Sequence, residues 1–175
     1  PATDSLVGGP VLTRRFHPAF GVGERGRTET GRGAGAVSVS YAAVALAKKI
    51  FGDLKGRSVV VLGAGEMGKL TALHMKSQGV PHITIVSRTM AHAARTAEAI
   101  GGASVAPWED LDNVIGASDI VITATGAAAP ILTKARIEAL MRPRRNRPLC
   151  VSDIALPRDV EAAAGAVEQV VRGNI

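Results

Sequence analysis

Short apolar runs alternate with longer amphipathic segments along most of the chain. The runs are rich in Val and Ile, as strands buried on both faces of a sheet are. Strands are predicted at 59–62, 82–88, 104–107, 118–125, 148–155 and 166–171, and helices at 36–51, 66–78, 90–100, 108–115 and 133–140. Strands that alternate with helices at this spacing form an α/β structure, with a mostly parallel sheet and helices on both of its faces.

The start of the chain departs from this pattern. Prolines and glycines interrupt every helical period there, so we expect an arm or the end of a connecting helix over 1–35 and an α/β domain over 36–175. In the first helix of that domain, Val37, Tyr41 and Val44 are spaced close to a helical period. They define the expected buried face of this helix, with Tyr41 in the core or at its rim.

Composition and charge narrow the possible functions. Of the 175 residues, 46% are hydrophobic and 21% are charged, which is enough for a packed core. Aromatic residues make up only 3%, which argues against clustered platforms that stack nucleic-acid bases. The net charge of +6 at pH 7 suits a phosphorylated cofactor, an acidic membrane surface or nucleic acid.

The sequence gives little support for disulfides, a metal site, a catalytic residue, secretion or membrane insertion. The single cysteine, Cys150, excludes an intrachain disulfide framework, and because it lies in an apolar strand we expect a buried small hydrophobe and not a nucleophile. The four histidines show no metal-ligand spacing, so neither a metal site nor a catalytic residue is predicted. No signal peptide or membrane-spanning run is visible, so we expect a cytoplasmic protein with no membrane partner. The chain begins with Pro1 and not Met, which suggests a piece of a longer protein.

A glycine-rich motif follows the first predicted strand and opens the next helix. It has the form GxGxxG and consists of Gly63, Ala64, Gly65, Glu66, Met67 and Gly68. In this context Gly63 permits a tight turn, Gly65 leaves room for a pyrophosphate, and Gly68 lets the helix pack closely on the strand. The free N–H groups and the helix dipole would then bind phosphate. The motif predicts a dinucleotide site on a Rossmann-like, doubly wound sheet, the alternative being a purely structural turn.

The end of the second strand indicates which dinucleotide is bound. An NAD site carries Asp or Glu there, but this chain has Ser87, Arg88 and Thr89, with no acid between Gly79 and Glu98. A guanidinium binds a 2′-phosphate with two hydrogen bonds, and the neighbouring hydroxyls can add more. These residues predict NADPH as the cofactor, unless Arg88 is only a solvated charge.

Two further loops end at the same edge of the sheet. Thr125 and Gly126 lie at the end of the fourth strand, and Asp153 and Pro157 lie at the end of the fifth. Ligands of open α/β sheets bind beyond the carboxyl ends of the strands. These four residues are therefore predicted on the nicotinamide side of the cofactor, with ordinary turn residues as the alternative.

An arginine-rich segment joins the last helix to the fifth strand. It contains Arg142, Arg144, Arg145 and Arg147. Such a segment either contacts RNA phosphates or forms a solvated loop at the far end of the sheet, and the solvated loop is the prediction.

Several stretches together resemble bacterial glutamyl-tRNA reductase. They are RTETGRGAGAVSVSYAAVALAKKIFGDLKGRSVVVLGAGEMGKLTALH, SRT, ATGAAAPIL and DIALPRDV, and the resemblance runs from about Val11 to the end of the chain. It covers the central NADPH-binding domain of that family, and it implies the strand order 3-2-1-4-5-6. It also implies pyrophosphate binding at the glycine motif, 2′-phosphate binding at Ser87, Arg88 and Thr89, and nicotinamide contacts at the two later loops.

The resemblance also implies a reaction and partners. Members of the family reduce glutamate esterified to tRNA to glutamate-1-semialdehyde, in porphyrin and other tetrapyrrole biosynthesis. They use a catalytic Cys in another domain, whose motif does not occur in this chain, so we expect no turnover from this chain alone. Glutamyl-tRNA would reach the parent protein through its other domains, the parent would be a homodimer, and a downstream aminomutase is a possible partner.

Two alternatives stay open without the resemblance. One is an NADP-dependent reductase of the shikimate dehydrogenase type, which needs a Lys–Asp pair on a further domain. The other is a dinucleotide-sensing module without catalysis. Activity of the full-length parent with glutamyl-tRNA separates these alternatives from the first interpretation.

Overall fold

The structure is a computed structural model, and it describes residues 34–175. The strands are β1 (Ser58–Leu62), β2 (His82–Ser87), β3 (Ser104–Pro107), β4 (Ile120–Thr123), β5 (Leu149–Asp153) and β6 (Val170–Asn174). The α-helices are α3 (Ala34–Phe51), α4 (Glu66–Ser77), α5 (Met90–Ile100), α6 (Leu111–Ala117) and α7 (Lys134–Met141). Short 3₁₀ turns are η1 (Trp108–Asp110), η2 (Arg142–Arg144) and η3 (Ala162–Ala166).

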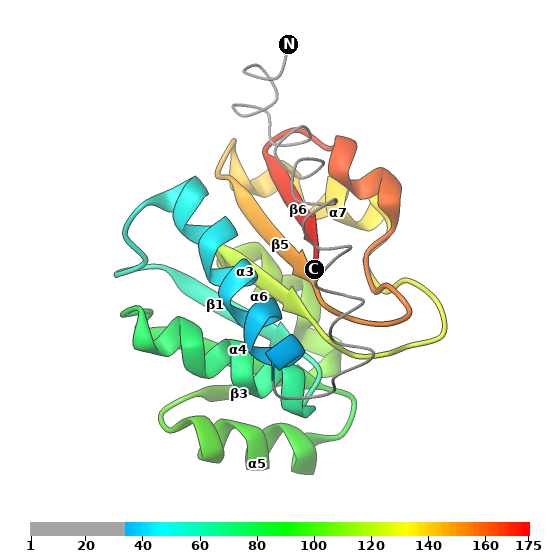
Figure 1. The fold of residues 1–175 in the computed structure, drawn as a ribbon. Helices are drawn as coiled ribbons and strands as arrows, with labels where there is room; N and C mark the ends of the chain where they lie inside the picture. Colours follow the sequence, from blue (N-terminus) through cyan, green and yellow to red (C-terminus); the bar gives the residue numbers. More distant parts are fainter. Residues whose placement is uncertain (1–33) are drawn as a thin grey trace.

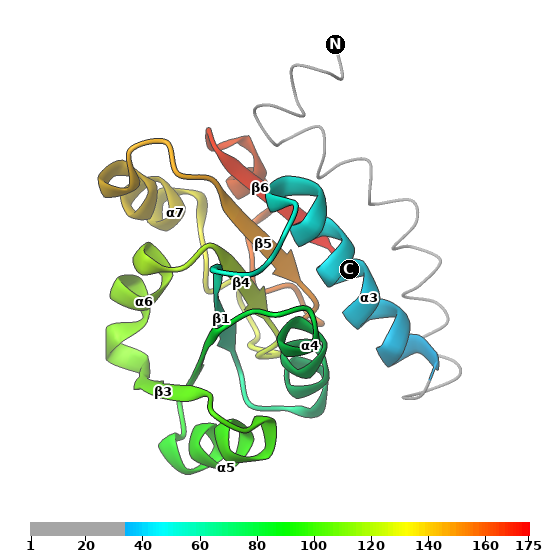
Figure 2. The same ribbon diagram turned by 90° about the vertical axis from the view of Figure 1, so that its left-hand side faces the viewer.

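The six strands form one sheet in the order β3-β2-β1-β4-β5-β6, and every neighbouring pair is parallel (Figure 1). The predicted Rossmann-like fold and strand order are confirmed. The order reverses at β1, which lies between β2 and β4. Figure 2 shows α3 and α4 on one side of the sheet and α6 and α7 on the other.

Each face of the sheet covers its own hydrophobic core. Successive side chains of a strand point to opposite faces of the sheet, so alternate residues of β1 belong to different cores. Val59 and Val61 pack with α3, α4 and α5, whereas Val60 and Leu62 pack with α6 and α7. The central strands are therefore buried on both sides, which explains their continuous apolar runs.

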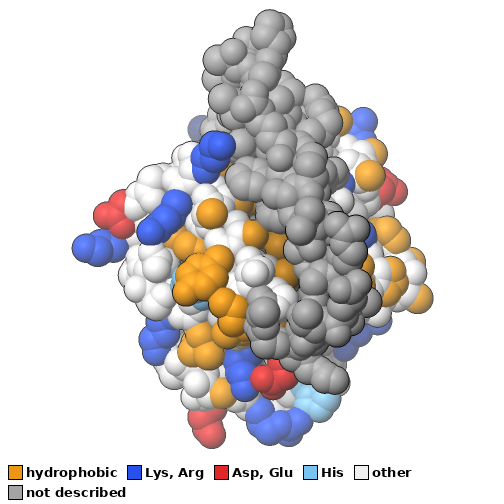
Figure 3. All heavy atoms as spheres, in the orientation of Figure 1, with side chains coloured by type: hydrophobic (Ala, Val, Ile, Leu, Met, Phe, Trp, Pro, Cys, Tyr) orange, Lys and Arg blue, Asp and Glu red, His pale blue; other side chains and the backbone are white. Residues whose placement is uncertain are grey.

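Helix α3 buries only part of the predicted face: Val44 is buried, but Val37 and Tyr41 are exposed. Its buried side chains are mostly small, such as Ala43 and Ala47, whereas 42% of Val37 and 60% of Tyr41 are exposed. Tyr41, expected in the core or at its rim, is exposed, so this expectation is wrong. Small residues allow α3 to lie close to α4, and Tyr41 instead sets its ring edge-on against His74 of α4, with 4.2 Å between ring centroids. Figure 3 shows exposed hydrophobic atoms on this side of the molecule.

Most other boundaries differ from the prediction by only a few residues, and three of the differences change the description of the fold. Helix α3 begins at Ala34 and not at residue 36, and the rest of the predicted arm lies outside the described residues. The predicted helix 108–115 is divided into η1 and α6. Strand β6 begins at Val170 and not at residue 166, because the preceding alanines form η3 and Gln169 turns the chain with a φ of 66°. Between residues 34 and 175, no helix is long and apolar enough to cross a membrane.

Candidate functional site

A cavity of about 440 Å³ lies at the carboxyl ends of β1, β2 and β4, where the strand order reverses. In open α/β sheets this crevice is where ligands bind, and the volume falls in the range of small-molecule sites. Most lining residues come from the ends of these strands and of β3 and from the loops that follow, and His92 comes from α5. They are Gly63, Ala64, Gly65, Ser87, Arg88, His92, Trp108, Ala124, Thr125 and Ala127.

Gly63 is required by the backbone itself. Its φ is 106°, a conformation that L side chains rarely adopt, and a Cβ there would lie 2.6 Å from the carbonyl oxygen of Ala124. Its N–H donates to the carbonyl oxygen of Val86 over 2.8 Å. The turn after β1 is thus held between the ends of β2 and β4.

The other two glycines of the motif serve different purposes. A Cβ on Gly68 would lie 3.0 Å from Cγ1 of Val61, so this glycine lets α4 pack closely on β1. A Cβ on Gly65 would meet no atom within 4 Å, and the φ of −85° at Gly65 suits any residue. Packing within the protein therefore does not require glycine at position 65. The open space beside it is the room that a pyrophosphate would need.

Helix α4 begins beside this space. Gly65 is its N-cap and makes no side-chain capping bond, so the first N–H groups of the helix have no partner within it. Glu66 and Met67 form the first turn without lining the cavity. From α5, the hydroxyl of Thr96 donates to the carbonyl oxygen of Ala64 over 3.0 Å, a contact that fixes the loop and that the sequence did not indicate.

Arg88 lies where an NAD site would carry an acid. It is exposed, and its guanidinium carbon lies 4.8 Å from the ring centroid of Trp108. Ser87 also lines the cavity, and its hydroxyl accepts a hydrogen bond from the N–H of Thr89. Thr89 itself is the N-cap residue of α5 and lies outside the lining. The cluster has one positive charge and no carboxylate in the lining, as a phosphate site requires.

The opposite rim is built from the loop after β4. Thr125 lines the cavity, and its hydroxyl and its N–H both donate to the carboxylate of Asp159, which is fully buried. The same hydroxyl accepts from the N–H of Ala127. Gly126, with a φ of 68°, turns the chain between them and does not line the cavity.

Asp153 lies below this rim and not in the cavity lining. Its side chain is fully buried and accepts hydrogen bonds from the hydroxyl of Thr123 and from the backbone N–H groups of Ala155, Asp159 and Val160. Burial raises the pKa of Asp153, and the backbone hydrogen bonds oppose that shift. The carboxylate thus supports the loop that carries Asp159. Pro157, in the same loop, is exposed and also lies outside the lining.

Cys150 is fully buried in β5, so the predicted small hydrophobe is confirmed. Desolvation raises the pKa of its thiol to about 12. A thiol in this state contains almost no thiolate at neutral pH and is a poor nucleophile.

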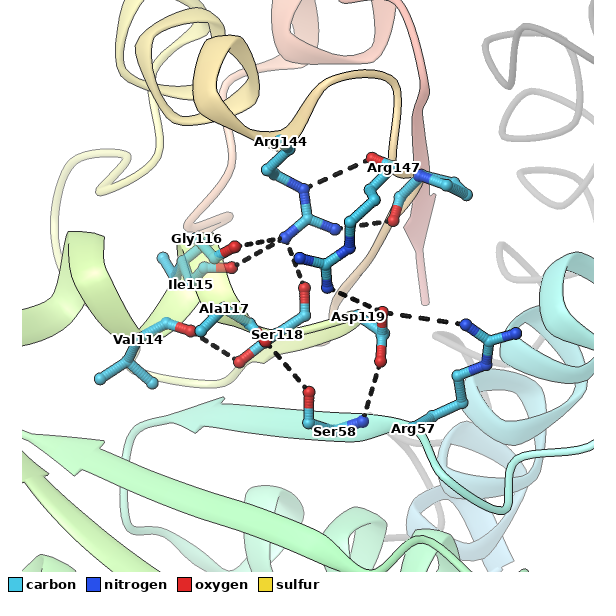
Figure 4. A network of polar contacts seen from close by, with 11 residues as sticks. Arg57, Ser58, Val114, Ile115, Gly116, Ala117, Ser118, Asp119, Arg144 and Arg147 are labelled. Atoms are coloured by element: carbon cyan, nitrogen blue, oxygen red, sulfur yellow. Dashed lines mark hydrogen bonds and ion pairs between the residues drawn. The ribbon is translucent and has the colours of Figure 1, made fainter.

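The prediction of a solvated arginine loop is wrong for Arg144, which is only 3% exposed. Figure 4 shows its guanidinium directed at the end of α6. It donates to the carbonyl oxygens of Ile115, Gly116, Ser118, Arg147 and Pro148. Burial, together with the charge of Arg147, lowers the pKa of Arg144 to about 10. The side chain satisfies carbonyl groups that the end of a helix leaves unpaired.

Asp119 joins this segment to the start of β1. One carboxylate oxygen accepts from the backbone N–H of Ser58, and the other lies 3.2 Å from the guanidinium of Arg147 (Figure 4). Arg142 and Arg145 remain exposed. The network lies at the amino ends of the strands, on the opposite edge of the sheet from the cavity.

Comparisons with known proteins show the family to which the chain belongs. The family model described as Shikimate / quinate 5-dehydrogenase matches residues 45–175, which include the whole cavity lining. The chain belongs to this family. The resemblance to glutamyl-tRNA reductase is also confirmed, because the glutamyl-tRNA reductase of Syntrophus aciditrophicus is 47% identical over 174 residues, covering 99% of this chain and 41% of that protein.

Solved structures of similar proteins have the same fold. The structure of glutamyl-tRNA reductase from Methanopyrus kandleri superposes with a TM-score of 0.73 at 35% identity, over 93% of this chain and 41% of that chain. Shikimate 5-dehydrogenase from Listeria monocytogenes, solved with shikimate and NAD, has a TM-score of 0.54 at 24% identity, over 77% of this chain and 52% of that chain. That second likeness concerns the fold alone. The chain spans about two-fifths of the reductases it matches.

Proposed function

We propose that this chain is the NADPH-binding domain of a glutamyl-tRNA reductase. The parent protein would reduce tRNA-bound glutamate to glutamate-1-semialdehyde in tetrapyrrole biosynthesis. The observation that carries the proposal is the pairing of open space at Gly65 with a cation, Arg88, at the end of β2. This pairing suits a dinucleotide with a 2′-phosphate.

Different residues of the chain would bind different parts of the cofactor. The N–H groups at the start of α4 would bind the pyrophosphate, and Arg88 with Ser87 would bind the 2′-phosphate. The loop around Thr125, held by Asp159, would lie on the nicotinamide side. When bound, NADPH supplies a hydride. In this proposal the chain's own residues bind and orient the cofactor.

Partners follow from the proposal. Glutamyl-tRNA would bind the parent mainly through its other domains, the parent would form a homodimer in the cytoplasm, and an aminomutase would take the aldehyde product. A shikimate dehydrogenase activity is the second candidate, favoured by the family model. The two differ in substrate: the parent protein should oxidise NADPH with glutamyl-tRNA and should not reduce NADP⁺ with shikimate.

Calorimetric titration of the chain with NADPH and NADH tests the binding proposal. We expect tighter binding of NADPH. Gly65→Val should abolish binding of both, because the side chain would fill the pyrophosphate space without clashing with the protein. Gly116→Val, another change into open space but in α6, is the control and should bind NADPH as the wild type does. Normal NADPH binding by folded Gly65→Val would refute the proposed site.

A further inference from the structure

The register between β2 and β3 makes Arg88 and Trp108 neighbours. Ser87 pairs with Pro107 as the last pair of the two parallel strands, so the next residue of each chain segment leaves the sheet at the same edge. These residues are Arg88 and Trp108, and the guanidinium carbon lies 4.8 Å from the centroid of the indole ring. This distance is within the range of a cation–π interaction.

The two partners differ in how firmly they are held. Trp108 is half-buried, begins η1 and packs against the hydrophobic core on the α6 and α7 side of the sheet. Arg88 is exposed, and among residues 34–175 it forms no ion pair with Asp or Glu. The indole is therefore a fixed surface for an otherwise freely moving side chain. Both residues line the cavity.

We propose that Trp108 is a positioning residue that holds Arg88 for the 2′-phosphate and so determines the preference for NADPH over NADH. The inference rests on the proposed function and names a specificity determinant within that site. A cation–π contact uses the flat face of the guanidinium and leaves the N–H groups at its edge free to donate to phosphate oxygens. Holding the side chain in advance removes part of the entropy cost of binding.

A purely structural role for Trp108 makes a different prediction. If the indole only stabilised the loop after β3, its loss would weaken NADPH and NADH equally. NADH has no 2′-phosphate, so a loss confined to NADPH identifies an effect that acts through Arg88. The ratio of the two affinities is thus the measurement that separates the two roles.

The experiment compares Trp108→Leu, Trp108→Phe and Arg88→Ala, and the double variant Trp108→Leu with Arg88→Ala, by calorimetry with each cofactor. Trp108→Leu should weaken NADPH binding about two- to fivefold, the size of an exposed cation–π contact. NADH affinity should not change. Trp108→Phe should restore most of the preference, and in the Arg88→Ala background Trp108→Leu should have no further effect on NADPH.

A matched control is available at the other end of the sheet. The guanidinium carbon of Arg57 lies 4.6 Å from the ring centroid of Phe51, far from the cavity lining. Phe51→Leu removes that cation–π contact and should leave both affinities unchanged. Thermal unfolding of every variant checks that each is folded.

The possible outcomes separate the role of Trp108 from the proposed function. Equal losses for the two cofactors in Trp108→Leu, or an unchanged preference in that variant, would overturn the role of Trp108 while leaving the proposed function intact. Failure of the wild-type chain to bind either cofactor would overturn the proposed function, and this inference with it. Trp108 is the only tryptophan in the chain, so its fluorescence gives an independent readout: NADPH binding should change its emission.

Discussion

The carboxylate of Asp159 binds Thr125 at two points: it accepts from the N–H over 2.8 Å and from the hydroxyl over 2.5 Å. Thr125 follows β4 and Asp159 follows β5, so this contact joins the loops of two adjacent strands. The buried Asp153 supports Asp159 from below by accepting its N–H. The rim of the cavity that carries Thr125 is therefore a hydrogen-bonded unit and not an independent loop.

Asp159→Asn should weaken this rim. The amide NH₂ group cannot accept from Thr125, so one partly buried donor loses its partner, at a cost of about 1 kcal/mol in the free energy of unfolding. NADPH and NADH affinities should fall by similar factors, because the 2′-phosphate is not involved. Denaturant unfolding and calorimetry measure the two effects. Asp112→Asn, which alters an exposed ion pair with Arg136, is the control and should cost less than about 1 kcal/mol.

Arg88→Ala should discriminate between the cofactors. Loss of charge-assisted hydrogen bonds to a 2′-phosphate should cost about 1.5–3 kcal/mol of NADPH binding and little NADH binding. The exposed Arg95 of α5 does not line the cavity, so Arg95→Ala serves as the charge-matched control. Equal losses for both cofactors in Arg88→Ala would show that Arg88 does not bind the 2′-phosphate.

Cys150 should be chemically inert in the folded protein. Because its pKa is raised to about 12, its reaction with a maleimide should stay slow from pH 7 to 9 and should become fast in denaturant. Cys150→Ser should leave NADPH affinity unchanged, since the thiol is fully buried in β5, away from the cavity lining. Rapid labelling of the native chain would contradict the buried position.

The raised pKa of Cys150 also makes the free energy of unfolding depend on pH. The folded pKa lies above the unfolded value of about 8.5, so the folded state retains a proton that the unfolded state releases. The contribution of Cys150 to stability is complete below pH 8.5 and is lost as the pH rises from there toward 12. Cys150→Ala should therefore reduce the decline of the unfolding free energy above pH 8.5.

Arg144 should be the only arginine of segment 142–147 whose side chain is essential for folding stability. Arg144→Ala leaves the carbonyl groups at the end of α6 without their donor, and should lower the free energy of unfolding by at least about 1.5–3 kcal/mol. Arg145→Ala, a change at the exposed residue directly after η2, should alter it by less than about 0.5 kcal/mol. Similar effects of the two changes in denaturant unfolding would contradict the capping role.

Much of the fold could be predicted because its signals are local. The buried runs of β1, β2 and β4 consist of consecutive apolar residues, since strands covered on both faces need no polar positions. The GxGxxG motif, placed between the first strand and a helix, identified the turn at Gly63. These features depend on neighbours within a few residues, and so the sequence alone determined them.

Other features depend on which elements meet, and only the tertiary structure decided them. The face that α3 buries is set by the close approach of α4, which favours alanines over Tyr41. Arg144 is buried because η2 meets the end of α6, 26 to 29 residues away along the chain. Nothing in the residues around Arg144 distinguishes it from the exposed Arg145.

Some residues of the candidate site could be predicted from the sequence, and others could not. Gly63, Gly65 and Arg88 were predicted from the sequence because each lies within three residues of the end of a strand and has a property that a dinucleotide site needs. Trp108 and Asp159 were not found, because one acts through the register of β3 beside β2 and the other through the loop after β5. A contact between segments 20 to 34 residues apart leaves no periodic trace in the sequence, and the pairing of strands and loops in space determined it.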